Sequence, residues 1–105
     1  MRIFGLKTCD TCRKARKALP EAEFVDVRAA PLSKEDLARF WQVLGEGLLN
    51  KRSTTWKGLD EGARAGDPVD LMLAHPALMK RPVIEDGDAL YLGWTGEVQA
   101  KLLGK

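Results

Sequence analysis

Residues 1–27, MRIFGLKTCDTCRKARKALPEAEFVDV, predict the fold of this chain. A short apolar strand over residues 1–5 precedes a helix over residues 8–19, in which apolar residues recur at helical spacing between basic ones. Pro20 ends that helix, because proline disfavours helical conformation in the residue before it. Residues 23–27 contain the β-branched and aromatic residues that favour a second strand. A strand, a helix and a strand of these lengths form a βαβ unit, so the two strands should run parallel.

The rest of the sequence predicts three or four further helices and a β-hairpin. Ser33 begins a helix with apolar residues at i, i+3, i+4 and i+7. Asp67 and Pro68 mark another helix start, an N-cap followed by proline at the first helical position. An Asp-Gly pair within residues 80–92 predicts the hairpin, and Thr95 should cap a last helix. In the helix after Ser33 we expect three residues in the core: Phe40, Trp41 and Leu44.

The order of these elements is that of thioredoxin, with helices inserted between its two halves. Residues 48–59 are harder to assign and predict a polar loop with a short helical turn. We therefore expect an α/β, thioredoxin-like fold with a four-stranded mixed sheet and an inserted helical region. A length of 105 residues predicts a single domain over residues 1–105.

Composition excludes several classes of function. A net charge of +2, from scattered basic and acidic residues, is too weak to indicate a nucleic-acid-binding protein. The sequence has no apolar run near the roughly 18 residues of a membrane span and no signal-peptide pattern at its start. We expect a cytoplasmic protein that binds neither nucleic acid nor membrane. Cysteine pairs in that reducing compartment are more often catalytic, redox-sensing or metal-binding than structural.

Cys9 is the candidate nucleophile. A free thiol has a pKa of about 8.5 and is a weak nucleophile near neutral pH. At a helix N-terminus Cys9 would be stabilised as a thiolate by free N–H groups and the helix dipole. Lys7 and Arg13 add positive charge nearby, and the Cys12 S–H lies one turn along the helix. Cys12 is then the candidate resolving thiol, which would close an intramolecular disulfide after Cys9 has reacted.

Two other interpretations of the cysteine pair remain open. The pair could be half of a zinc site, but His75 is the only histidine, so a closed structural site would need a carboxylate as its fourth ligand. The two residues could also be buried structural cysteines. A CxxC at the first turn after a strand of a thioredoxin-like pattern favours thiol chemistry over both, and we predict no metal.

Residues before the third strand are further candidates for the site. In a thioredoxin-type arrangement the proline that opens this strand is cis and faces the reactive cysteine, which predicts a cis bond at Pro82; a trans proline at a strand start is the alternative. Arg81 would then stand near Cys9, and Arg52 in the polar loop could reach the same place. Taken singly, each arginine also fits a solvated surface charge. Guanidinium groups near a thiolate would lower its pKa and bind an anionic group. The anion-binding candidates are Arg52, Arg81, Lys7 and Thr8.

Four segments together resemble the arsenate-reductase-like (ArsC/Spx) family. They are FGLKTCDTCRKA at residues 4–15, LLNKRSTTW at residues 48–56, HP at residues 75–76 and KRP at residues 80–82. Each segment alone is weak, but the set in this order is specific, and the resemblance covers essentially the whole chain. Within the family the sequence looks most like the YffB-like branch, whose members carry the second segment.

The resemblance implies a nucleophilic cysteine at Cys9 and anion-binding arginines at Arg52 and Arg81. The YffB-like branch is associated with glutathione binding, which implies a glutathione-dependent thiol reductase. No bound cofactor is implied, and glutathione would be a co-substrate.

Two departures from the family pattern bear on the reaction. Glutaredoxin-linked arsenate reductases use a third arginine shortly after the last strand, where this chain has GWTG at residues 93–96. A two-arginine site should hold arsenate less well. Cys12 adds a second cysteine at the head of the helix, as in Spx, a redox-sensing regulator that binds the RNA polymerase α subunit.

The resulting hypothesis is a thiol/disulfide oxidoreductase. Cys9 attacks and Cys12 resolves, and the partner is glutathione or another small thiol or oxyanion substrate, with glutaredoxin or another protein as a further partner. The alternatives are an Spx-type redox-sensing regulator that binds RNA polymerase and a glutaredoxin-coupled arsenate reductase.

Overall fold

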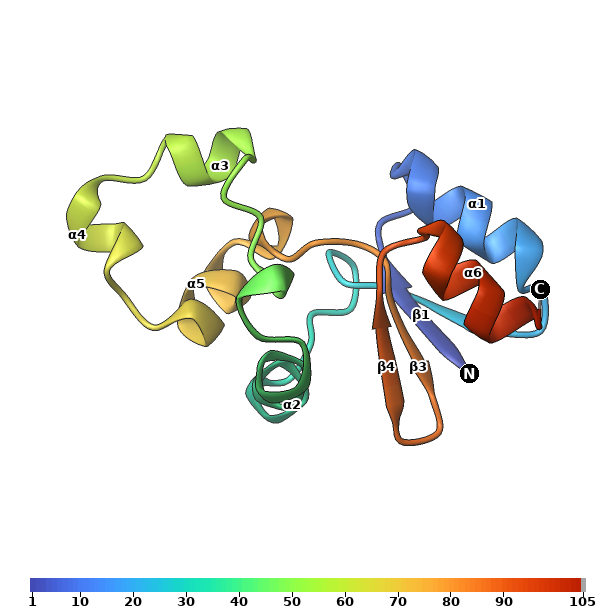
Figure 1. Ribbon diagram of the computed structural model, residues 1–105. Helices are drawn as coiled ribbons and strands as arrows, with labels where there is room; N and C mark the ends of the chain where they lie inside the picture. Colours follow the sequence, from blue (N-terminus) through green and yellow to red (C-terminus); the bar gives the residue numbers. More distant parts are fainter. Residues whose placement is uncertain (105) are drawn as a thin grey trace. The chain divides into compact units, whose positions relative to one another are not determined.

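The computed structural model describes residues 1–104, which form two compact units (Figure 1). The first unit comprises Met1–Ala30 and the chain from Arg81 onward, and it contains the β-sheet. The second unit comprises Pro31–Lys80 and is helical. The inserted helical region predicted from the sequence corresponds to this second unit.

The sheet of the first unit has four strands in the order β2-β1-β3-β4. They are β1 (Arg2–Gly5), β2 (Glu23–Asp26), β3 (Val83–Asp86) and β4 (Ala89–Leu92). β1 and β2 are parallel, whereas β3 is antiparallel to both of its neighbours. The mixed thioredoxin-like sheet and the βαβ unit expected from the sequence are thus confirmed.

Two helices, α1 (Asp10–Ala18) and α6 (Gly96–Leu103), pack on one face of this sheet (Figure 1). Ala15 of α1 and Val98 of α6 belong to the hydrophobic core on that face. Thr95 caps α6, as predicted, by accepting a hydrogen bond from the N–H of Val98 at 3.2 Å. On the sheet, this core is formed by one row of cross-strand partners: Phe24, Ile3, Ile84 and Tyr91.

The hairpin between β3 and β4 lies where the Asp-Gly pair predicts it. Asp86 pairs with Ala89, so the turn has two residues. Gly87 adopts a φ of 61°, a conformation that a side chain disfavours, which explains a glycine at this position.

The helical unit contains four α-helices and two 3₁₀ turns among the described residues. α2 (Lys34–Leu44) begins at Ser33, whose hydroxyl accepts a hydrogen bond from the N–H of Asp36 at 3.1 Å. This is one half of the predicted capping box. The other elements are η1 (Gly45–Leu48), α3 (Thr54–Lys57), α4 (Glu61–Arg64), α5 (Pro68–Ala74) and η2 (Pro76–Leu78).

Part of the sequence-based prediction for the helical unit is wrong. Phe40 is fully buried, but Trp41 and Leu44 are only partly buried. Of the residues of α2, only Leu37 and Phe40 are fully buried. Helical turn α4, which has one turn and no buried residue, was not predicted at all.

Asp67 caps α5, as its sequence predicts, and we expect a measurable stability cost when the cap is removed. Its Oδ1 accepts hydrogen bonds from the N–H groups of Val69 at 2.8 Å and of Asp70 at 3.4 Å. Asp67→Ala leaves both N–H groups without this acceptor and should lower the free energy of unfolding by about 1 kcal/mol. Urea denaturation followed by far-UV circular dichroism measures the change; an unaltered midpoint would contradict it.

Along residues 1–104, no helix combines the length and the hydrophobicity that crossing a bilayer requires.

Candidate functional site

Cys9 lies in the tight turn that joins β1 to α1. The N–H of Cys9 donates to the carbonyl of Leu6 at 3.1 Å, and the carbonyl of Cys9 accepts from the N–H of Arg13 at 3.0 Å. These two bonds close the turn and start the helix, so Cys9 occupies the N-cap position. Its partly exposed side chain therefore lies at the positive end of the helix dipole.

The surroundings of Cys9 favour its thiolate form. Partial burial alone would raise the pKa of Cys9, but the backbone N–H and side chain of Cys12 and the guanidinium of Arg81 lower it, and their combined effect is larger. Within residues 1–104 no side-chain cap of ordinary hydrogen-bond geometry forms at Cys9. The lowered pKa thus reflects several hydrogen-bond donors, on Cys12 and Arg81, together with the Arg81 charge, all of which favour the thiolate.

Cys12 has the opposite character. Its side chain is fully buried in the first turn of α1. Burial and, to a smaller extent, the neighbouring Cys9 thiolate raise the pKa of Cys12 to about 11, against opposing effects of the Leu6 backbone and Arg81. Both cysteines are free thiols. The pair therefore combines one accessible, acidic thiol with one enclosed, protonated thiol.

Gly5, at the end of β1, makes room for Cys12. A Cβ atom on Gly5 would lie 2.5 Å from the Cys12 Sγ and 3.2 Å from its Cβ. Only a glycine lets the strand backbone approach this side chain so closely.

The antiparallel pairing of β3 brings Arg81 and Pro82 to the Cys9 turn. Because Val83 pairs with Phe4 in an antiparallel register, the residues that precede β3 lie next to the residues that follow β1. The Arg81–Pro82 peptide bond is cis, and Pro82 is fully buried. Arg81 is partly buried, and its guanidinium is close enough to Cys9 to stabilise the thiolate.

The other sequence candidates have different surroundings. Lys7 and Thr8 are exposed in the β1–α1 turn. The Arg13 guanidinium donates to the Thr8 carbonyl at 3.5 Å and forms an ion pair with the Asp10 carboxylate at 3.4 Å. The cation that lowers the pKa of Cys9 is instead Arg81. Arg52 is exposed in the helical unit, where its backbone N–H donates to the Asn50 Oδ1 at 3.1 Å. The first unit thus brings together Cys9, Cys12 and Arg81.

In the part of the chain that the structure describes, no group of three His, Cys, Asp or Glu side chains is placed to hold a metal ion.

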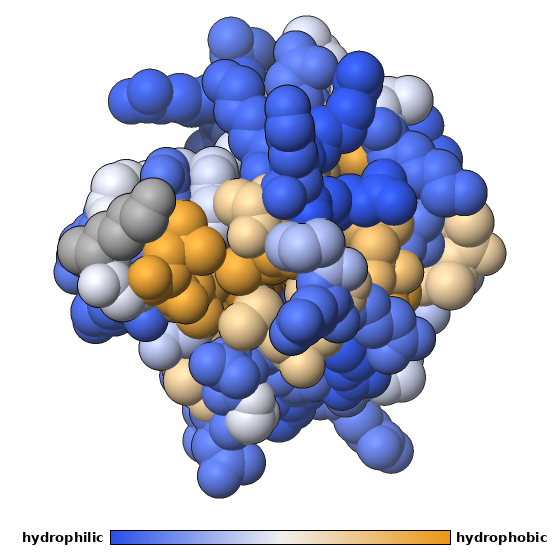
Figure 2. All heavy atoms as spheres, turned by 90° about the vertical axis from the view of Figure 1, so that its right-hand side faces the viewer, coloured by the Kyte–Doolittle hydropathy of each residue, from blue (hydrophilic) through white to orange (hydrophobic). Residues whose placement is uncertain are grey.

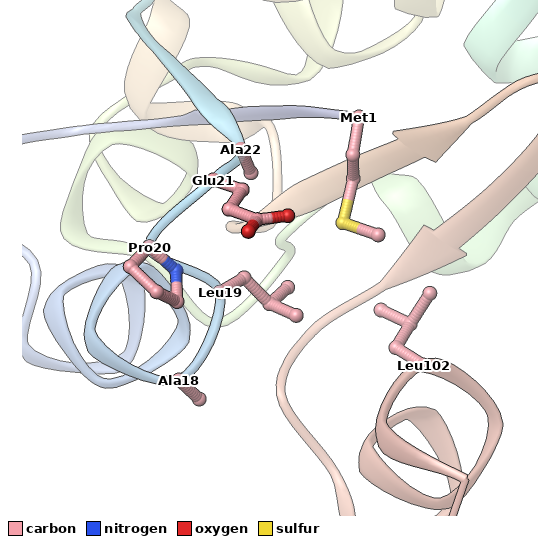
Figure 3. Close-up of a pocket in the computed structure, with 7 residues that line it drawn as sticks. All are labelled: Met1, Ala18, Leu19, Pro20, Glu21, Ala22 and Leu102. Carbon is pink, nitrogen blue, oxygen red and sulfur yellow. The ribbon is translucent and has the colours of Figure 1, made fainter.

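A pocket with a mixed polar and apolar lining is separate from the cysteine pair. On the face of the molecule shown in Figure 2, hydrophobic side chains gather across the middle, with hydrophilic side chains above and below them. One pocket on the first unit is lined by the end of α1, by Met1 and by Leu102, and Glu21 contributes a carboxylate (Figure 3). Neither cysteine lines this pocket, so it does not form part of the thiol site.

One residue near the site was missed by sequence reasoning. Asp26, the last residue of β2, accepts a hydrogen bond from the N–H of Lys7 at 3.2 Å. The only signal in the sequence is an aspartate at the end of a predicted strand, which by itself is common.

The comparisons with known proteins agree with this geometry. The ArsC family model matches residues 4–102. A solved structure of a protein named YffB superposes with a TM-score of 0.87 at 35% identity, covering 95% of this chain and 96% of that one. The solution structure of an arsenate reductase (ArsC) related protein from Brucella melitensis gives a TM-score of 0.73 at 36% identity, covering 99% of this chain and 93% of that one.

A curated relative is the global transcriptional regulator Spx of Streptococcus pyogenes. It is 31% identical over 111 aligned positions, which cover 95% of this chain and 83% of Spx. The resemblance found in the sequence is thereby confirmed. A family model that matches nearly the whole chain, a shared thioredoxin-like fold and a cysteine pair at the head of α1 lead to one conclusion: the chain belongs to the ArsC family.

Proposed function

We propose that this protein is a thiol/disulfide oxidoreductase that uses glutathione as co-substrate. One observation supports the proposal: hydrogen bonds from Cys12 and the Arg81 guanidinium lower the pKa of the partly exposed Cys9, whereas burial, followed by the Cys9 thiolate, raises the pKa of Cys12 to about 11. Such an asymmetric pair has a defined nucleophile and a defined resolving thiol.

In the first step the Cys9 thiolate attacks a disulfide R–S–S–R′. A bond forms between Cys9 Sγ and one substrate sulfur, the S–S bond of the substrate breaks, and the other half leaves as a thiolate that takes a proton from solvent. Cys9 reacts first because it is both partly exposed and the more acidic thiol.

In the second step Cys12 resolves the mixed disulfide. Once Cys9 is covalently bound it no longer carries negative charge, so the contribution of its thiolate to the raised pKa of Cys12 disappears, while that of burial remains. Cys12 loses its proton, attacks the Cys9 Sγ and releases the second thiolate. The two cysteines are oxidised to a disulfide and the substrate is reduced to two thiols.

Glutathione would complete the cycle. One glutathione thiolate opens the Cys9–Cys12 disulfide and forms a mixed disulfide with Cys9. A second glutathione thiolate attacks the glutathione sulfur of that mixed disulfide, so that Cys9 leaves as a thiolate and glutathione disulfide is released. Arg81, which lies beside Cys9, would bind a carboxylate of glutathione, with Lys7 and Thr8 in the neighbouring turn as further donors. Arg52 of the helical unit is the remaining candidate for this role.

Intact mass spectrometry of reduced protein treated with glutathione disulfide tests the proposal. Wild type should form the internal disulfide without retaining glutathione. Cys12→Ser should retain one glutathione, because Cys9 still attacks but nothing resolves the product. Cys9→Ser is the matched control and should stay unmodified, because its remaining thiol is buried and weakly acidic. An unreactive Cys12→Ser, or a Cys9→Ser that reacts as fast as wild type, would rule out this assignment of roles.

A redox-sensing regulator is a second candidate, favoured by the 31% identity to a global transcriptional regulator Spx and by the buried resolving cysteine. Such a protein would act through a protein partner, RNA polymerase in the case that the resemblance implies. It predicts a stable Cys9–Cys12 disulfide that reduced glutathione opens only slowly. A turnover assay with a model disulfide and glutathione distinguishes the two candidates. A rate proportional to protein concentration supports the oxidoreductase, and no turnover supports the regulator.

Arsenate reduction coupled to glutaredoxin is a third candidate, favoured by the likeness to an arsenate reductase (ArsC) related protein. The loop after β4, at Gly93 to Thr95, offers no guanidinium. We therefore expect arsenate turnover with glutaredoxin to be weak or absent, and robust turnover would favour this candidate over the first.

A further inference from the structure

Asp26 connects the end of β2, by hydrogen bonds of its carboxylate, to the turn that contains Cys9. Its Oδ1 accepts hydrogen bonds from the N–H groups of Arg28 at 2.9 Å and Ala29 at 3.1 Å. Its Oδ2 accepts from the N–H of Lys7 at 3.2 Å, across 19 residues of sequence. One carboxylate thus connects two loops that leave the same edge of the sheet.

The position of Lys7 makes this contact relevant to the thiol. Lys7 lies inside the turn that is closed by the hydrogen bond from Cys9 N–H to the Leu6 carbonyl. The placement of the Cys9 sulfur relative to its stabilising donors depends on this turn. Asp26 itself pairs with Gly5, the residue that packs against Cys12. Asp26 therefore contacts the segment that bears Cys9 in two ways: its carboxylate accepts from Lys7, and its backbone position pairs with Gly5.

The three N–H donors also act on the carboxyl group. Hydrogen bonds from Arg28, Ala29 and Lys7 hold the pKa of Asp26 below its usual range, and the Lys7 charge adds a smaller effect. Near neutral pH the contact with the turn is consequently made by a charged acceptor, the stronger kind of hydrogen bond.

We propose that Asp26 is a positioning residue, whose carboxylate fixes the Cys9 turn in the geometry that activates the thiol. The inference rests on the proposed function only in taking Cys9 as the reacting group. No contact between Asp26 and a substrate is required.

A comparison of two substitutions separates positioning from simple charge. The negative charge of Asp26 alone would raise the pKa of Cys9, so both Asp26→Asn and Asp26→Ala should lower that pKa if charge were all that mattered. Asparagine keeps an oxygen acceptor for the Lys7 N–H, whereas alanine keeps none. If Asp26 positions the turn, the pKa of Cys9 should be higher in Asp26→Ala than in Asp26→Asn.

The measurement is the rate of alkylation by iodoacetamide as a function of pH, in a Cys12→Ser background so that Cys9 is the only thiol. We expect the midpoint in Asp26→Ala to lie about half a unit above that in Asp26→Asn, and its rate to be about threefold lower at a pH below both midpoints. Asp67→Ala, in the same background, is the matched control. It removes another carboxylate that accepts backbone N–H groups, two in this case, but one that belongs to the helical unit. It should leave the midpoint unchanged.

Equal midpoints in Asp26→Asn and Asp26→Ala would overturn the positioning role, as would a shift of the same size in Asp67→Ala. Failure of the proposed function looks different. In that case Cys9 of the parent Cys12→Ser protein would itself titrate at or above the ordinary thiol pKa of about 8.5, whatever stands at position 26.

Discussion

Replacing Gly5 with alanine should destabilise the protein by about 1–3 kcal/mol, the usual cost of forcing an extra methyl group into a well-packed core. The added Cβ would lie 2.5 Å from the Cys12 Sγ, closer than non-bonded atoms approach, and 3.2 Å from the Cys12 Cβ, which is also unusually tight. Cys12 is fully buried and cannot swing into solvent, so β1 or α1 must shift. Urea denaturation of the reduced protein measures the loss.

The same substitution at Gly96 is the matched control. Gly96 begins α6, and a Cβ there meets nothing within 4 Å. Gly96→Ala should therefore leave the stability unchanged or raise it by a few tenths of a kcal/mol, through the better helix propensity of alanine and its lower freedom in the unfolded chain.

A double-mutant cycle with Cys12→Ala tests the stated cause. If the contact with Sγ produces the loss, Gly5→Ala should cost less in the Cys12→Ala background, because the closest atom is gone. The remaining contact with the Cys12 Cβ should preserve part of the cost. Equal costs in both backgrounds would mean that the clash with sulfur is not responsible.

The fold could be predicted from the sequence largely because its signals are local. Strand, helix and strand follow one another within residues 1–27, and the caps Ser33, Asp67 and Thr95 each act on N–H groups two or three residues away. Such contacts depend on neighbouring residues alone, so the sequence pattern is sufficient. The four-residue helix α4 is an exception. Asp60 caps it by accepting a hydrogen bond from the N–H of Ala63 at 2.7 Å, but a single turn is too short to show a periodic pattern.

In the candidate site, too, the features that depend on neighbouring residues could be predicted, whereas those that depend on distant residues could not be predicted from local patterns. Cys9 and Cys12 are local to one turn, and their unequal burial follows from helical geometry. The part played by Arg81 depends on the pairing of β3 with β1, which joins residues about 80 positions apart and was expected only from the thioredoxin-type arrangement. Arg13 was expected to act on Cys9 because it is close in sequence, but its side chain reaches Asp10 and the Thr8 carbonyl instead. Proximity in sequence does not determine which way a long side chain points.

The second large effect that we expect is on the pKa of Cys9, when Arg81 is replaced. We expect Arg81→Met to raise the pKa of Cys9 by about one unit, at the lower end of the range for a nearby opposite charge. Burial already acts to raise this pKa; the donors on Cys12 oppose it, and Arg81 adds both a hydrogen bond and a charge that favour the thiolate. Methionine keeps an apolar stem of similar length, so loss of packing is small. The pH profile of iodoacetamide alkylation in the Cys12→Ser background gives the midpoint directly.

The direction of the effect on rate follows from that shift. At a pH below both midpoints the thiolate fraction falls about tenfold for each unit by which the pKa rises, so Arg81→Met should react up to about tenfold more slowly. At a pH well above both midpoints the two rates should converge, because the thiol is then ionised in either protein.

Two further substitutions identify which property of Arg81 matters. Arg81→Lys keeps the charge but loses the planar set of donors, so its midpoint should fall between those of the parent and of Arg81→Met. Arg13→Met is the matched control, since it removes another arginine close to Cys9 in sequence whose side chain bonds to Asp10 and the Thr8 carbonyl. A shift in Arg13→Met as large as that in Arg81→Met would show that the general positive field of the first unit, and not the guanidinium beside Cys9, activates the thiol.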